Sequence, residues 1–176
     1  MSHGTKVNFR VLIAVMAGVL ILALLNWNIF TRERLIENGK IVLLQLAPVD
    51  PRSLMQGDYM ILNYALTNEL ERQRELKDDG IFILKLDEQN IGQFSRFDDG
   101  SAIQDDEVRL RYRVRNNEWR NRVKIATNAF FFEEGQGEIY EPARYGEFRV
   151  DDSGDAILTQ LRDGELKVLG RSAVLN

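Results

Sequence analysis

The sequence contains no cysteine and a single histidine, His3. Without cysteine the chain can form no disulfide, thiolate metal site or cysteine nucleophile. His3 lies in the tail before the first apolar segment, where it cannot build a histidine-based triad or a multi-histidine metal site. The residue types therefore exclude much of the usual hydrolase chemistry, and they predict no metal and no cofactor.

Basic residues are also fewer than acidic residues. The 176 residues include 23 Lys and Arg against 27 Asp and Glu, a net charge of −4. Two of the basic residues precede the apolar segment, so residues 31–176 carry 21 basic and 27 acidic side chains. A nucleic-acid-binding domain is usually basic throughout, and this balance therefore predicts no nucleic-acid partner.

Long apolar runs are confined to one place, residues 11–25. With its flanks this segment covers residues 9–30, a helix of roughly 33 Å that can cross a bilayer core. Trp27 and Phe30 suit the membrane interface. A cleaved signal peptide is the alternative, but no small-x-small cleavage site follows the run. We expect a tail at 1–8, a transmembrane helix at 9–30, a stalk at 31–39 and one domain at 40–176.

The short basic tail decides the expected orientation. Lys and Arg flank the apolar run on both sides, so their count alone gives no bias. The tail resembles that of a signal anchor and is a poor object to translocate. We therefore expect a cytoplasmic N-terminus, a single pass through the lipid bilayer at residues 9–30, and an extracytoplasmic C-terminal domain.

The domain itself is patterned mainly for strands. Residues 40–46 form a continuous apolar run, which indicates a strand buried on both faces. Leucines among charged residues predict a short helix at 66–76, with Asn68 as one candidate cap, and residues 138–144 predict another. Alternating or short apolar runs predict further strands at 57–64, 81–86, 91–97, 145–150, 155–161 and 165–169. The expected fold class is mainly β (α+β), an antiparallel sheet with one or two short helices after the transmembrane helix.

The clearest pattern is a predicted hairpin. Alternating runs at 108–115 and 118–125 flank Asn116-Asn117, which suits a two-residue turn. That register places Arg113 opposite Arg120, Arg111 opposite Arg122 and Arg109 opposite Lys124. One face, here named the basic face, then carries Arg109, Arg111, Arg113, Arg115, Arg120, Arg122 and Lys124.

Like charges opposite one another destabilise a sheet, so the basic face requires compensation. One interpretation is that acidic residues fold over it, or that the long side chains splay into water. The other is that it binds an anion: lipid headgroups, an anionic glycan or an acidic partner. The acidic residues available for neutralisation are Asp98, Asp99, Asp105, Asp106 and Glu133.

One candidate nucleophile is Ser53, four positions before Gly57-Asp58. In type I signal peptidases a Ser-Met pair also precedes Gly-Asp, and a lysine acts as the base. Here Ser53 lies closer to the glycine than in that family, and the nearby Lys77 and Lys85 stand in no recognisable motif.

Four carboxylates, Asp50, Asp58, Glu133 and Glu134, could meet in an acid–base or divalent-cation site. Asp50 and Asp58 also have adequate turn-forming roles. The three phenylalanines at 130–132 have burial as their usual role. If exposed, they would indicate docking to a membrane or partner.

Residues 57–64 read GDYMILNY, a turn followed by a short strand, after the lead-in PVDPR at 48–52. This stretch resembles the signature of the GDYXXLXY family, and residues 131–135 and 143–147 resemble that family's C-terminal block. The resemblance implies a bacterial protein with an N-terminal membrane helix, often encoded beside polytopic membrane proteins, and it implies no known reaction or cofactor. The positions it singles out are Arg52, Asp58, Tyr59, Tyr64, Glu134, Tyr140 and Tyr145.

These observations favour a membrane-anchored accessory or binding module of the bacterial envelope, associated with an integral membrane partner. The basic face, through Arg109, Arg111, Arg113, Arg120, Arg122 and Lys124, would bind an anion or partner. The alternative is an envelope hydrolase acting on a peptide or glycan at the outer face of the inner membrane. The sequence identifies no small-molecule ligand.

Overall fold

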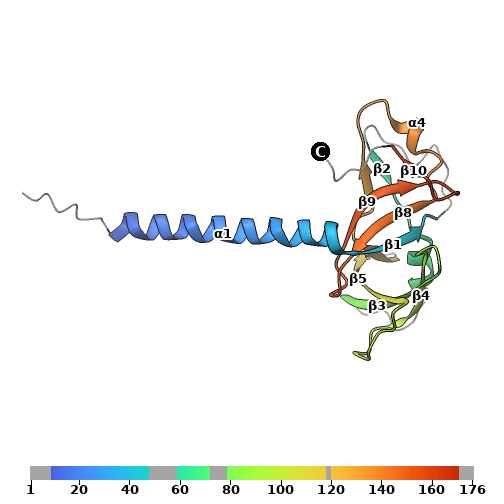
Figure 1. Ribbon diagram of the computed structural model, residues 1–176, viewed down its shortest axis with the longest axis horizontal. Helices are drawn as coiled ribbons and strands as arrows, with labels where there is room; N and C mark the ends of the chain where they lie inside the picture. Colours follow the sequence, from blue (N-terminus) through green and yellow to red (C-terminus); the bar gives the residue numbers. More distant parts are fainter. Residues whose placement is uncertain (1–8, 48–58, 72–78, 118–119, 171–176) are drawn as a thin grey trace, which may run out of the picture.

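The computed structural model describes residues 9–47, 59–71, 79–117 and 120–170; for Phe9 and residues 116–117 and 120–122 it describes the backbone alone. One long helix projects from a β-sheet head, and the chain enters the head directly from that helix (Figure 1).

The helix α1 (Phe9–Asn38) continues through the expected stalk. Residues 31–38 contain neither Gly nor Pro, so nothing interrupts the helix after the apolar segment. Leu35 is buried, and Gly39 donates its N–H to the Leu35 carbonyl at 2.9 Å where the helix ends. The stretch Arg10–Asn38 is long and apolar enough to cross a membrane. The stalk is therefore a stiff extension of the candidate span.

Within the described residues, the strands form two four-stranded antiparallel sheets and one two-stranded sheet. The first contains, in order, β1 (Lys40–Gln45), β8 (Tyr145–Val150), β9 (Ala156–Arg162) and β10 (Val168–Leu169). The second contains β4 (Gly92–Phe97), β3 (Asp79–Leu86), β5 (Glu107–Asn117) and β6 (Arg120–Ile125). The third pairs β2 (Tyr59–Ile61) with β7 (Ala129–Phe131), and the short helices are α3 (Ala65–Leu70) and α4 (Gly137–Tyr140). The predicted mainly β class is confirmed.

A single hydrophobic core joins the two larger sheets. Val42 and Leu44 of β1 are fully buried, together with Phe82 of β3 and Phe148 of β8. Leu43 is buried as well, which confirms the prediction that this strand has no exposed face at its centre. Leu43 also forms an isolated bridge with Ile91, just before β4. β1 thus connects one sheet to the other.

The predicted register of the basic hairpin is wrong, although its faces are right. Arg113 lies opposite Lys124, and Arg115 lies opposite Arg122, four positions from the predicted pairing. The offset is an even number of residues, so Arg113 and Lys124 remain on the predicted face. The cause is a tertiary contact. The Arg111 N–H donates to the carbonyl of Gly154 at 2.8 Å, whereas the predicted hairpin would have paired Arg111 with Arg122.

Several predicted boundaries also shift. The cap of α3 is Tyr64 and not Asn68, whose place is inside the helix, and most of the predicted remainder to residue 76 lies outside the described residues. The helix predicted at 138–144 is α4, which ends at Tyr140. The last predicted strand is reduced to β10, because the Asp163 carboxylate accepts the N–H groups of Glu165 and Lys167 and holds a turn there. β7 was not predicted as a strand.

Gly39 offers a test of the junction between helix and head. A Cβ at this position would lie 2.4 Å from the Leu35 carbonyl oxygen and 3.1 Å from the Arg149 Cβ. We expect Gly39→Ala to lower the free energy of unfolding of the head by about 1–3 kcal/mol, the usual cost of overpacking. Urea denaturation of the full chain in micelles, followed by circular dichroism, measures it. The control is Gly164→Ala, whose Cβ would meet only Arg144 at 3.8 Å, and equal effects of the two would contradict the prediction.

Candidate functional site

A cleft of about 660 Å³ lies between the C-terminal part of α1 and the head. Trp27, Thr31 and Arg32 line it from the helix, and the outer face of the β5–β6 hairpin lines it from the head. The turn between β8 and β9 contributes the remaining wall. In Figure 1 both β5 and β9 are drawn on the side of the head from which α1 projects. The C-terminal part of α1 therefore forms one wall of this cleft.

The alternation of β5 supplies the charge on the head's side of the cleft. Leu110 and Tyr112 point into the core, so the arginines between them point outward. Arg111, Arg113 and Arg115 of β5 and Lys124 of β6 all line the cleft. The structure thus brings together four members of the predicted basic face, and Arg32 of α1 adds a fifth cation from the opposite wall.

Two arginines of the basic face are neutralised within the chain. Asp98 accepts the Arg109 Nε–H at 3.0 Å, as one of the predicted interpretations requires. Arg111 donates to the Asp155 carboxylate at 2.8 Å, a partner 44 positions away that the sequence did not indicate. Of the other acidic residues considered, Asp99 pairs with Arg96 and Asp106 pairs with Lys85.

The remaining cations of the cleft have no such partner. Within the part of the chain that the structure describes, the exposed side chains of Arg113, Arg115 and Lys124 form no ion pair or hydrogen bond. The side chains of Arg120 and Arg122 lie outside the described part. Arg113 lies opposite Lys124 in the ladder, so like charges face each other here and destabilise the hairpin unless an anion compensates them.

The described residues of the GDYMILNY stretch, Tyr59 to Tyr64, lie in and after β2. β2 pairs with β7, and the ring of Tyr59 lies 5.7 Å from that of Phe131. Tyr64 is buried, donates its hydroxyl to the Thr127 carbonyl at 2.7 Å, and packs edge-on against Phe148. Burial raises the pKa of Tyr64 well above its usual value, because the phenolate would lose its hydration. Tyr64 is therefore a neutral hydrogen-bond donor in the core.

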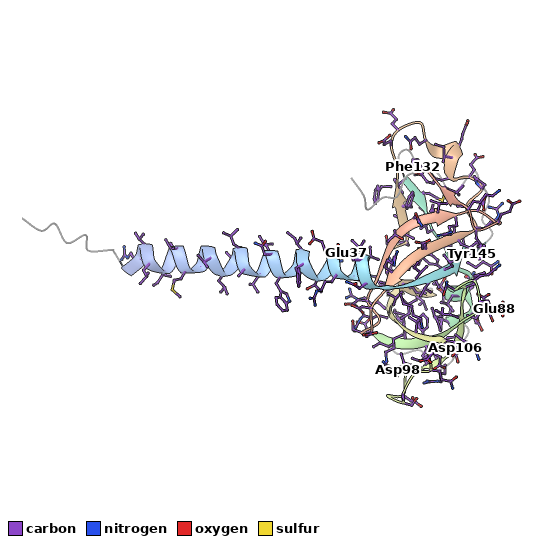
Figure 2. All side chains as sticks on the ribbon, in the orientation of Figure 1. Glu37, Glu88, Asp98, Asp106, Phe132 and Tyr145 are labelled. Atoms are coloured by element: carbon purple, nitrogen blue, oxygen red, sulfur yellow. The ribbon has the colours of Figure 1, made fainter. Side chains whose placement is uncertain are left out.

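The C-terminal block supplies a second aromatic group. Tyr140 is buried, with its ring 5.0 Å from Phe130 and 5.2 Å from Phe132. Phe131 is 71% exposed. Two of the three phenylalanines therefore pack around Tyr140, and the third faces outward. Figure 2 shows that Phe132 lies far from the acidic residues Asp98 and Asp106.

Of the other predicted site residues, the structure describes Glu134 and Tyr145, which lie in different segments of the chain. Glu134 is exposed beside Gly135, which has a positive φ of 81°, and Tyr145 is half-buried at the start of β8. Arg52 and Asp58, together with Asp50 and Ser53, lie outside the described residues. Among the residues that are described, no group of three or more Asp, Glu, His or Cys side chains is arranged to hold a metal ion.

One buried ion pair was not predicted. The Glu147 carboxylate on β8 is buried and accepts the Arg162 Nε–H from β9 at 2.6 Å. Arg162 also donates to the Leu166 carbonyl, and Thr159 donates to the Glu147 carbonyl oxygen. The sequence shows only a Glu and an Arg 15 positions apart, with nothing to indicate that they face each other.

The structure therefore defines a class of protein: a β-sheet head carried stiffly on one long apolar helix, with a cationic cleft where the two meet. The chain belongs to the GDYXXLXY family, since the family model described as GDYXXLXY protein matches residues 21–161, most of its length. The match begins inside α1 and ends in β9, so it includes both walls of the cleft. Comparison with curated proteins and with solved structures gave no match.

Alkaline pH tests the role of Tyr64. Because burial raises its folded-state pKa, the folded head keeps the phenol proton that the unfolded chain releases above pH ~10. The stabilisation is fully present below that pH and is lost as the pH rises toward the folded-state pKa. Relative to Tyr64→Phe, the natural chain should lose about 1.4 kcal/mol per pH unit above 10. Urea unfolding at pH 9 to 11 measures this difference, and parallel pH profiles for the two proteins would disprove it.

Arg162→Met tests the buried ion pair. It leaves the Glu147 charge buried without its partner, which should cost about 3–5 kcal/mol of unfolding free energy. The double variant Glu147→Gln/Arg162→Met removes both charges and should recover a large part of the loss. Chemical denaturation of all three variants checks this, and a double variant no more stable than Arg162→Met would contradict it.

Proposed function

We propose that this chain is a membrane-anchored accessory or binding module of the bacterial envelope, which associates with an integral membrane partner. Its N-terminus lies in the cytoplasm and its head lies outside. The observation that carries the proposal is the stiff connection between the apolar helix and the head.

A flexible linker would be enough if the helix only kept the head near the membrane. Instead α1 runs without a break to Asn38, Leu35 is buried, and Arg149 donates to the Gly39 carbonyl at 3.2 Å. This arrangement fixes the direction in which the head faces relative to the helix axis. A fixed direction is useful to a protein that must present one face to a neighbour embedded in the same membrane.

The apolar part of α1 also favours a partner within the bilayer. It is apolar all round and exposed along its length, so lipid or another helix must cover it. Ala14 and Gly18 lie one turn apart, and nothing lies within 4 Å of the position of a Gly18 Cβ. Small residues at this spacing allow close approach of a second transmembrane helix.

The described motif residues support a binding role rather than catalysis. Tyr64 and Tyr140 are buried in packing, and Glu134 is exposed. An envelope hydrolase would need reactive groups that converge on one concave site. Among the described residues, the cationic cleft is a concave site whose unpaired side chains are suited to binding anions.

The test is affinity purification of the tagged full chain from its native membranes. We expect a polytopic membrane protein to co-purify in stoichiometric amount, and Gly18→Leu to reduce its yield several-fold by blocking close helix packing. Met16→Leu, on the opposite face of the helix, is the matched control and should leave the yield unchanged. Purification of the chain alone would overturn the proposal, and equal yields for both variants would remove the helix contact from it.

A further inference from the structure

The cationic cleft lies at the level of the lipid headgroups when the apolar helix spans a bilayer. The apolar run ends at Leu25, and Trp27 follows it at 73% exposure, as expected of a residue at the membrane interface. The helix rises ~1.5 Å per residue, and the headgroup layer on each side of a bilayer is roughly 5–8 Å thick. Thr31 and Arg32 on the cleft wall lie roughly 6–8 Å beyond the interfacial Trp27, and therefore at the level of the headgroups when the span is in place.

The charge of the cleft is opposite to that of the surrounding head. Five cations line it, namely Arg32, Arg111, Arg113, Arg115 and Lys124, against the two carboxylates of Asp151 and Asp155. Residues 31–176 as a whole carry 27 acidic and 21 basic side chains, so this concentration of positive charge runs against the composition.

Both carboxylates already have partners. Asp151 accepts the N–H groups of Ser153 and Asp155 in its own turn, and Asp155 accepts from Arg111. Three of the cations, Arg113, Arg115 and Lys124, have no partner among the described residues. The cleft therefore carries positive charge that an anion from outside the chain would balance.

We propose that this cleft binds the headgroup of an anionic phospholipid. The guanidinium groups of Arg113 and Arg115 contact the phosphate, which they can bind through paired N–H donors. Lys124 adds a point charge, Arg32 approaches from the helix, and the Trp27 ring lies against the glycerol and upper acyl chains. A volume of about 660 Å³ lies in the usual range of small-molecule sites and accommodates one such headgroup. The binding is a property of the chain alone and goes beyond its association with a membrane partner.

The experiment uses the purified full chain, without any partner protein, in nanodiscs of phosphatidylcholine with a minor fraction of phosphatidylglycerol. Native mass spectrometry counts the lipids that remain bound. We expect preferential retention of phosphatidylglycerol, reduced about tenfold or more in the triple variant Arg113→Gln/Arg115→Gln/Lys124→Gln. The matched control removes three cations elsewhere, in the triple variant Lys85→Gln/Arg144→Gln/Lys167→Gln, and should retain the lipid as the natural chain does.

Every outcome bears on the proposal. Equal loss in the two triple variants would mean that general charge attracts the lipid, and equal retention of both lipids in the natural chain would mean that no selective site exists. Displacement of the lipid by millimolar inorganic phosphate would assign the cleft to free phosphate and overturn the lipid assignment. If circular dichroism shows that the cleft variant is unfolded, Arg32→Gln on the opposite wall gives the test, with a several-fold loss expected. Because no partner protein is present, failure here leaves the proposed association with a membrane protein standing.

Discussion

The unbroken passage of α1 into β1 is the constraint on which the rest of the structure depends. Leu35 is buried at the end of the helix, and at Gly39 any side chain would strike the backbone of Leu35. The next residues enter β1, whose centre is buried in the core, so the helix axis is set by core packing. A side chain on α1 therefore keeps a fixed place relative to the head, and the cleft can have walls from both.

The same strand links the family signature to the junction. Leu46, just after β1, bridges Tyr64, whose hydroxyl reaches the Thr127 carbonyl. Thr127 lies in the segment after β6 and also lines the cleft. Tyr64, the last letter of the signature, thus holds the segment that ends the basic hairpin against the core. This connection gives the signature a structural role: it fixes the hairpin beneath the helix.

Periodicity in the sequence predicted the features that depend on neighbouring residues. It failed for the features that depend on contacts between residues distant in the sequence. The apolar run at 11–25, the buried strand at 40–46 and the outward arginines of β5 follow from composition and a period of two. The hairpin register did not, because Gly154 takes the Arg111 N–H that local pairing would have used. The ion pairs Arg111–Asp155 and Arg162–Glu147 also join strands whose adjacency no local pattern reveals. The sequence did not predict the cleft for the same reason, since one of its walls is formed by the segment predicted as a stalk.

The distribution of charge gives the cleft a second consequence. Its five cations and two carboxylates carry a net charge of +3, which leaves −9 for the rest of residues 31–176, whose total is −6. An anionic membrane surface attracts the first group and repels the second, and both effects decay within about a Debye length, ~8 Å at physiological salt. If a headgroup occupies the cleft, as we propose, the same membrane surface would repel the net negative remainder of the head. Electrostatics and the stiff junction would then favour one posture of the head, with the cleft against the lipid.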